Sequence, residues 1–113
     1  MQYTEIKEML AETRLPATYY SWPENDPLHP VPALPYLVWY LPSTENVAAD
    51  DKVYKVIQTL NIELYTATKD FDTEMVVESV LNSWGMVWDK QETYIDTEHM
   101  YEVLYIMEVV ING

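Results

Sequence analysis

The segment from Glu98 to Ile111 constrains the fold of this chain more than any other. If it forms a strand, one file of alternate residues is wholly apolar: Tyr101, Val103, Tyr105, Met107, Val109 and Ile111. The other file is also mostly apolar: Met100, Glu102, Leu104, Ile106, Glu108 and Val110. A strand with one solvated face would show a clean polar file instead. The pattern therefore predicts that both faces of this strand are covered, in a chain of only 113 residues.

Two segments show the spacing of amphipathic helices. The first is predicted to be capped by Thr4 and stopped by Pro16. The second is predicted to be capped by Asp72 or Thr73 and to end at Gly85, a residue suited to a left-handed stop. Its apolar stripe consists of Val76, Val77, Val80, Leu81 and Trp84. We expect Trp84 to lie in the core.

The remaining ordered segments are typical of strands. They cover residues 17–22, 36–41, 53–66 and 86–95. The proline-rich stretch at 23–35 predicts an extended surface loop, and residues 43–50 read as a polar connection. Because strands outnumber helices and connections are short, we expect an α+β fold. It would be a mainly antiparallel sheet of about five strands with two helices packed on one face, in a single domain, 1–113.

The charge balance limits the partners. Nineteen acids against six bases give a net charge of −13, which disfavours specific binding to nucleic acids because such binding relies on lysine and arginine. The acidity is either a solvated surface or part of the function. The chain has no cysteine, no apolar run long enough to span a membrane and no signal peptide at its N-terminus. We expect a soluble protein made in a cytoplasm, without a membrane partner.

The sequence carries no convincing catalytic motif. With two glycines it lacks a glycine-rich phosphate loop. His99, beside Glu98 and Asp96, is the best candidate for acid–base chemistry or metal binding, but the same residues also suit a turn. We therefore expect no enzyme activity, no cofactor and no metal.

The aromatic residues point instead to protein surfaces. Ten tyrosines and four tryptophans stand against one phenylalanine, and Tyr and Trp are enriched at protein interfaces. The candidates for an interface with another subunit or with a tail tube are Tyr36, Trp39, Trp88, Tyr94, Leu104, Ile106 and Val110. The last three form the second apolar file described above. Either another subunit covers this file or the proline-rich loop does. If another subunit covers it, Glu102 and Glu108, which flank the file, would face bases of that neighbour such as Lys55 or Lys90.

Four pieces of the sequence resemble a known family. They are "PYLVWY", "NIELYT.TKD", "E..VESVL" and "ETYI..E..YEVLY", and the resemblance runs from about Leu15 to Val109. In this order they resemble a family of small prophage and siphophage structural proteins from Gram-positive bacteria. These motifs are structural, and the resemblance implies no catalytic or ligand-binding residue.

The resemblance implies a tail-completion or tail-terminator protein. Such a protein would form a hexameric ring on the head-proximal end of the tail, with the major tail protein and the head–tail connector proteins as partners. It would be assembled in the cytoplasm of the bacterial host. An acidic lumen in the ring would ease the passage of DNA. The candidates for the wall of this lumen are Glu45, Asp50 and Asp51, which are expected in one flexible loop. The alternative is that this loop is an ordinary solvated turn.

Three other functions remain open at this point. A neck or head-completion protein would join the portal side instead of the tail side. An acidic DNA mimic would block a host nuclease, but it needs carboxylates spaced like phosphates on one face, and here the acids are spread along the chain. A small enzyme would use Glu98 and His99.

Overall fold

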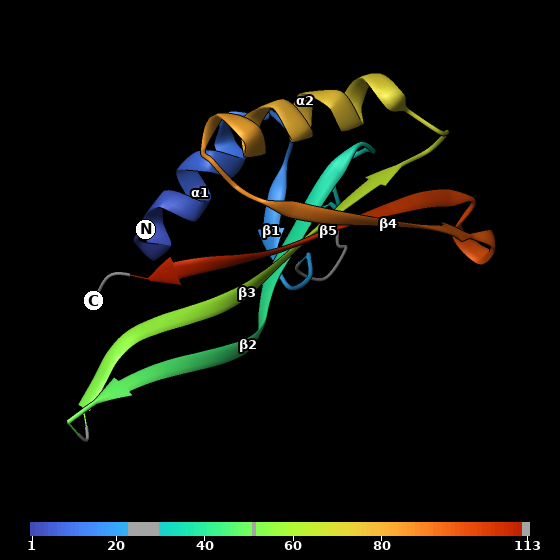
Figure 1. Ribbon diagram of the computed structural model, residues 1–113. Coiled ribbons are helices and arrows are strands. Elements are labelled where there is room, and N and C mark those ends of the chain that lie inside the picture. The colour runs from blue at the N-terminus through green and yellow to red at the C-terminus, as the bar shows by residue number, and fades with distance from the viewer. Residues whose placement is uncertain (23–29, 51, 112–113) are drawn as a thin grey trace.

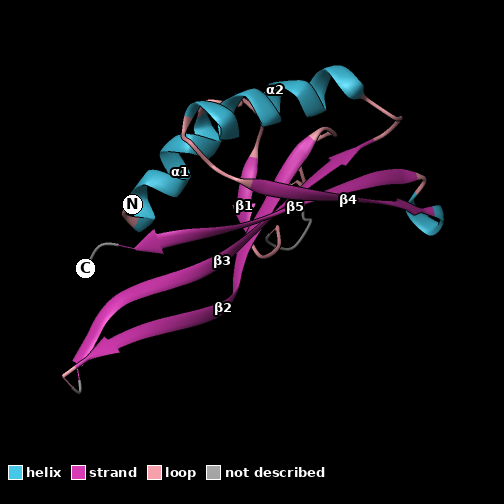
Figure 2. Cartoon of the chain, viewed as in Figure 1, coloured by secondary structure: helices cyan, strands magenta, loops and turns pink. Residues whose placement is uncertain are grey.

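The computed structural model describes residues 1–22, 30–50 and 52–111. One five-stranded sheet, in the order β1-β2-β3-β5-β4, carries two helices on the same face (Figure 1). The elements are α1 (Tyr3–Ala11), β1 (Ala17–Tyr19), β2 (Tyr36–Ala49), β3 (Lys52–Thr66), α2 (Phe71–Ser83), β4 (Trp88–Ile95), a 3-10 turn (Asp96–Glu98) and β5 (Met100–Ile111). The short β1 runs parallel to β2, and the other pairs are antiparallel. The predicted α+β fold is confirmed (Figure 2).

Both helices begin earlier than the sequence suggested. The N-cap of α1 is Gln2, not Thr4, and its backbone N–H donates to Glu5 Oε1 at 2.8 Å. The N-cap of α2 is Asp70, whose carboxylate accepts from the Thr73 backbone N–H at 3.0 Å. Asp72 instead lies in the first turn, where the helix dipole favours an acid.

The C-terminal end of α2 is as predicted. Gly85 has a φ of 73°, in the left-handed region that favours glycine. The N–H of the next residue, Met86, donates to the Leu81 carbonyl at 3.0 Å, which satisfies one of the last helical acceptors.

The core lies between the helices and the sheet. The predicted first file of β5 is buried there, with Val103 and Tyr105 at 1% and 0% exposure. It is joined by alternate residues of β3 and by one side of each helix: Leu60, Ile62, Leu64, Ile6, Met9, Leu10, Val77 and Leu81. Burial of these apolar side chains is the main force that holds the helices on the sheet.

The buried side of α2 differs from the predicted stripe. Val76 is 47% exposed, whereas Glu74 is only 2% exposed. Trp84 is partly buried against the core and not enclosed by it, and its indole N–H donates to Glu12 Oε2 at 2.5 Å. Helical spacing identified most of the buried face, since Val77 and Leu81 are buried and Val80 packs against the core, but it did not reveal that α2 also turns an acid with lysine partners toward the sheet.

Strand β2 is much longer than predicted. Residues 43–49 pair with residues 52–59 of β3, so the expected polar connection is a strand. Side chains support the pairing, with Ser43 Oγ donating to Thr59 Oγ1 at 2.9 Å and Thr44 Oγ1 to Gln58 Oε1 at 2.8 Å. We call residues 43–50 and 52–55 the arm; it projects beyond the rest of the sheet (Figure 1). The radius of gyration is accordingly 15.6 Å, against about 13 Å for a compact chain of this length.

Candidate assembly surface

The face of the sheet opposite the helices is here called the outer face. Neither helix of the described residues lies over it (Figure 2). The strand registers place on it the second file of β5, which lies between alternate residues of β3 and β4. Leu104 and Ile106 are partly exposed, and Val110 is 36% exposed. The structure therefore leaves this apolar file at the surface.

Aromatic side chains cover the β2 side of the outer face. Tyr20 packs on Tyr40, with 5.3 Å between ring centroids, and Trp22 packs edge-on to Tyr36 at 5.4 Å. Tyr36 in turn contacts Tyr65 at 5.5 Å. The start of the loop between β1 and β2 therefore covers β2 and not β5, while residues 23–29 of the proline-rich stretch lie outside the described part of the chain.

A carboxylate pair lies on the interior strands β3 and β5 of the outer face, near the end of the sheet away from the arm. The Tyr65 hydroxyl lies within hydrogen-bond reach of Glu63 and, at 3.0 Å, of Glu102 Oε2. A hydroxyl has a single proton to donate, so it serves one carboxylate at a time. Burial and the Glu63 charge raise the pKa of Glu102 above its ordinary value, although the Tyr65 hydrogen bond works against this. Burial and the same two carboxylates raise the pKa of Tyr65.

A depression lies beside this pair. Its volume is about 480 Å³, and it is lined by Thr59, Val87, Asp89, Ile106, Met107 and Glu108. Val87 is 89% exposed, an unusual position for a large apolar side chain. The depression is thus apolar at its centre and acidic at its rim, and among the described residues the only base that shares the outer face is Lys55 on the arm.

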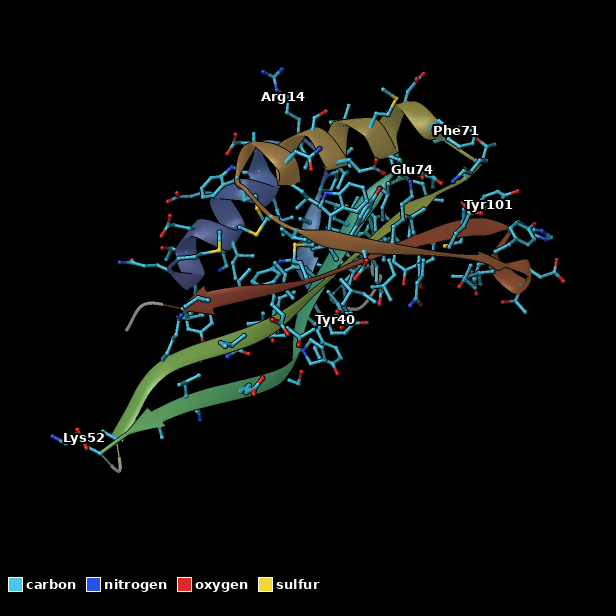
Figure 3. The ribbon with its side chains drawn as sticks, viewed as in Figure 1. Arg14, Tyr40, Lys52, Phe71, Glu74 and Tyr101 are labelled. Carbon is cyan, nitrogen blue, oxygen red and sulfur yellow. The ribbon has the colours of Figure 1, made fainter. Side chains whose placement is uncertain are left out.

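Two other lysines are engaged under α2. Glu74 is buried and binds Lys69 at 2.7 Å and Lys90 at 2.8 Å (Figure 3). Lys90 also binds Glu78 at 2.8 Å. These contacts pin α2 to β4, so the suggestion that Lys90 pairs with a neighbouring subunit is wrong.

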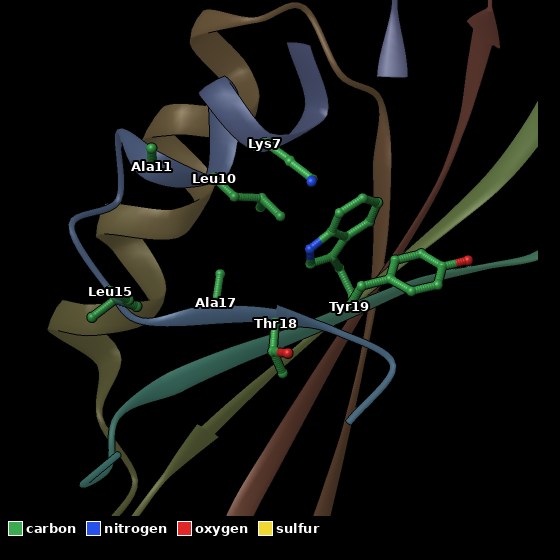
Figure 4. Close-up of a pocket in the computed structure, with 8 residues that line it drawn as sticks. Lys7, Leu10, Ala11, Leu15, Ala17, Thr18 and Tyr19 are labelled. Atoms are coloured by element: carbon green, nitrogen blue, oxygen red, sulfur yellow. The ribbon is translucent and has the colours of Figure 1, made fainter. Parts of the chain in front are cut away.

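The aromatic candidates divide between the two faces. Trp39 is 6% exposed on the helix side, edge-on to Tyr19 at 4.7 Å, and lines a pocket of about 430 Å³ beside α1 (Figure 4). Trp88 is partly buried on the same side and donates to Asn82 Oδ1 at 2.9 Å. Both tryptophans therefore pack within the subunit. Tyr36 lies on the outer face, whereas Tyr94 is 47% exposed and pairs with Tyr101 at 4.9 Å.

The expected acidic loop is not a loop. Glu45 lies in β2 on the arm, because the hairpin pairs through this segment. Asp50 forms the turn with a φ of 52°, and Asp51 lies outside the described residues. Glu45 and Asp50 therefore do not share one loop.

The segment around His99 is a turn. His99 is exposed, has a φ of 49°, and its N–H donates to the Asp96 carbonyl at 3.3 Å. The described residues contain no group of three or more side chains arranged to hold a metal ion. None of the helices in the described ranges is long and apolar enough to cross a membrane.

Sequence reasoning missed Glu63, Tyr65 and Val87. Glu63 read as an ordinary solvated position of an amphipathic strand. Its contact with Tyr65 and Glu102 depends on the register between β3 and β5, which the sequence does not reveal.

In the described part of the chain, the geometry defines a two-layer α+β fold whose sheet is covered by helices on one side only. Among solved structures, this fold is similar to that of a chain in the virion of a native gene transfer agent particle, with a TM-score of 0.65. The likeness covers 98% of this chain and 91% of that chain at 10% identity, so it concerns the fold. No family model and no curated protein sequence matches the chain.

Proposed function

We propose that the protein is a structural component of a phage or phage-like virion. The observation that carries this proposal is the similarity of nearly the whole fold to a chain of a gene transfer agent virion. The two chains agree over almost their full lengths, so the shared architecture includes the sheet as well as the helices. A subunit with a large uncovered face suits an assembly protein better than a monomer.

Within the virion, we propose the role of tail terminator. The protein would cap the tail tube as a hexameric ring and dock the tail to the head. The resemblance of residues 35–40, 61–70, 74–81 and 92–105 to siphophage tail-completion proteins supports this role. The outer face supports it as well, because a ring requires each subunit to offer two different contact surfaces, and the arm and the face of β5 differ from each other.

Deletion of the gene from a phage that carries it tests the role. A terminator deletion gives filled heads without tails together with free tails of uncontrolled length, as seen by electron microscopy. A neck or head-completion protein would instead leave free tails of normal length. Normal virions after deletion would refute the structural role altogether.

The acidic surface argues less well for a DNA mimic. Glu74 and Glu78 are engaged by Lys90, and the other described acids are spread over both faces of the sheet, both helices and the turns. A mimic would inhibit a nuclease in solution, whereas we expect no such inhibition.

A further inference from the structure

We propose that the arm of one copy docks on the outer face of a second copy, with Lys55 placed between Glu63 and Glu102 of that copy. This inference rests on the self-association included in the proposed function and names the surfaces that would make it. The occupant of the bare face is therefore another copy of this chain.

The arm lacks support within its own subunit. On the β2 side, β1 pairs only with Leu37–Trp39, and on the β3 side, β5 ends its pairing at Val56. Beyond these limits the arm is an isolated two-stranded ribbon, which is marginally stable in water. Val47 is 41% exposed on the arm, and the turn at its tip carries Lys52 (Figure 3). A ribbon of this kind is stabilised when it packs on a second surface.

Charge complementarity identifies that surface. Lys52 and Lys55 form no ion pair with the described residues, whereas Lys69 and Lys90 are both engaged under α2. On the outer face, Glu63 and Glu102 share one tyrosine hydroxyl and form no ion pair with the described residues. A lysine ammonium supplies three donors, enough to serve both carboxylates.

The pattern of side chains also matches. Lys55 shares its face of the arm with its cross-strand partner Val47, and Ile57 follows on the same face at the base of the arm, opposite Glu45. Glu102 shares the outer face with Leu104 two residues on and with Ile106 after it. Lys55 and its apolar neighbours Val47 and Ile57 can therefore lie over a glutamate followed by apolar residues. Apolar contact at the centre with charges at the rim is the usual anatomy of a protein interface.

The arm cannot reach this site in its own subunit. Glu102 pairs with Tyr65, which lies 10 residues along β3 from Lys55. At a rise of about 3.3 Å per residue, the two positions on this strand are about 33 Å apart. Only a second copy can bring Lys55 to Glu102.

A charge swap tests the contact. Lys55→Glu and Glu102→Lys should each weaken self-association of the purified protein about tenfold or more, because each places like charges together. An equal mixture of the two variants should associate again, since each then offers a surface that fits the other. Sedimentation velocity of each variant and of the mixture, at low ionic strength, measures this. Lys7→Glu is the matched control, with the same charge change on α1, and should associate like the parent protein.

Crosslinking supplies a second measurement. The chain has no cysteine, so Lys55→Cys and Glu102→Cys each introduce the only thiol. Mixed and oxidised, they should form the disulfide-linked heterodimer in preference to either homodimer. A parent protein that stays monomeric at its highest attainable concentration would overturn the inference, and so would a mixture that fails to recover. A phage deletion with no effect on assembly would refute the terminator role while leaving a recovered mixture as evidence for the arm contact.

Discussion

The buried Glu74 provides the sharpest test of how the helix layer is held. Its side chain is 3% exposed and lies between Lys69 and Lys90, whose side chains are 27% and 33% exposed. Removing one partner of a buried ion pair typically costs about 3–5 kcal/mol. Both lysines are partly solvated and each keeps a second acid, so we expect Glu74→Ala to lie at the low end, about 3 kcal/mol. For a domain of this size, that is a fall in Tm on the order of 10–20 °C.

The pH dependence of unfolding should change in a defined direction. Burial alone would raise the pKa of Glu74, but the hydrogen bonds and charges of Lys69 and Lys90 outweigh it and hold the pKa below its ordinary value of 4.5. A carboxyl group whose pKa is lowered in the fold stabilises the protein at pH values above its ordinary pKa. This stabilisation is lost as the pH falls through the pKa of the folded state. Urea unfolding between neutral and acid pH should therefore show a shallower acid loss in Glu74→Gln than in the parent.

A neighbouring residue provides the control. Met75 is on the same helix and is 63% exposed, so Met75→Ala should change the free energy of unfolding by about 0.5 kcal/mol or less. If Glu74→Ala costs no more than Met75→Ala, the ion cluster does not hold α2, and the apolar contacts of Val77 and Leu81 alone account for its docking.

Three further substitutions test separate parts of the structure. Glu102→Gln should raise stability at neutral pH, because burial and the Glu63 charge raise the pKa of Glu102 and so disfavour its charged form in the fold, and the gain should vanish in acid; a loss of stability at neutral pH would contradict this reasoning. Trp84→Ala should lower the free energy of unfolding in urea by about 2 kcal/mol, which is below the range for a fully buried tryptophan. A change near zero would show that the packing of Trp84 on the core contributes nothing. Gly85→Ala should cost about 1 kcal/mol from backbone strain alone, because an added Cβ meets nothing within 4 Å, and Gly85→Asn should cost less in the same assay.

Local pattern was sufficient for much of the architecture. The alternation in residues 53–66 and in Tyr101–Ile111 identified two strands and the file of each that faces the core. Gly85 identified the end of α2, since few other residues adopt its backbone conformation readily. These features depend on residues that are close together in the sequence, so the sequence alone predicts them.

Other features depend on which segments meet in space. The polar run at residues 43–49 became a strand because β3 offers it a partner, although its own composition suggested a connection. Glu74 is buried because Lys69 and Lys90 arrive from the preceding loop and from β4. The Glu63–Tyr65–Glu102 cluster exists only in the observed register of β3 and β5, since a slip of one residue would move Glu102 to the opposite face. The sequence by itself determined that the last strand is apolar on both sides, and the tertiary structure decided that the helices cover one of these sides and leave the other at the surface.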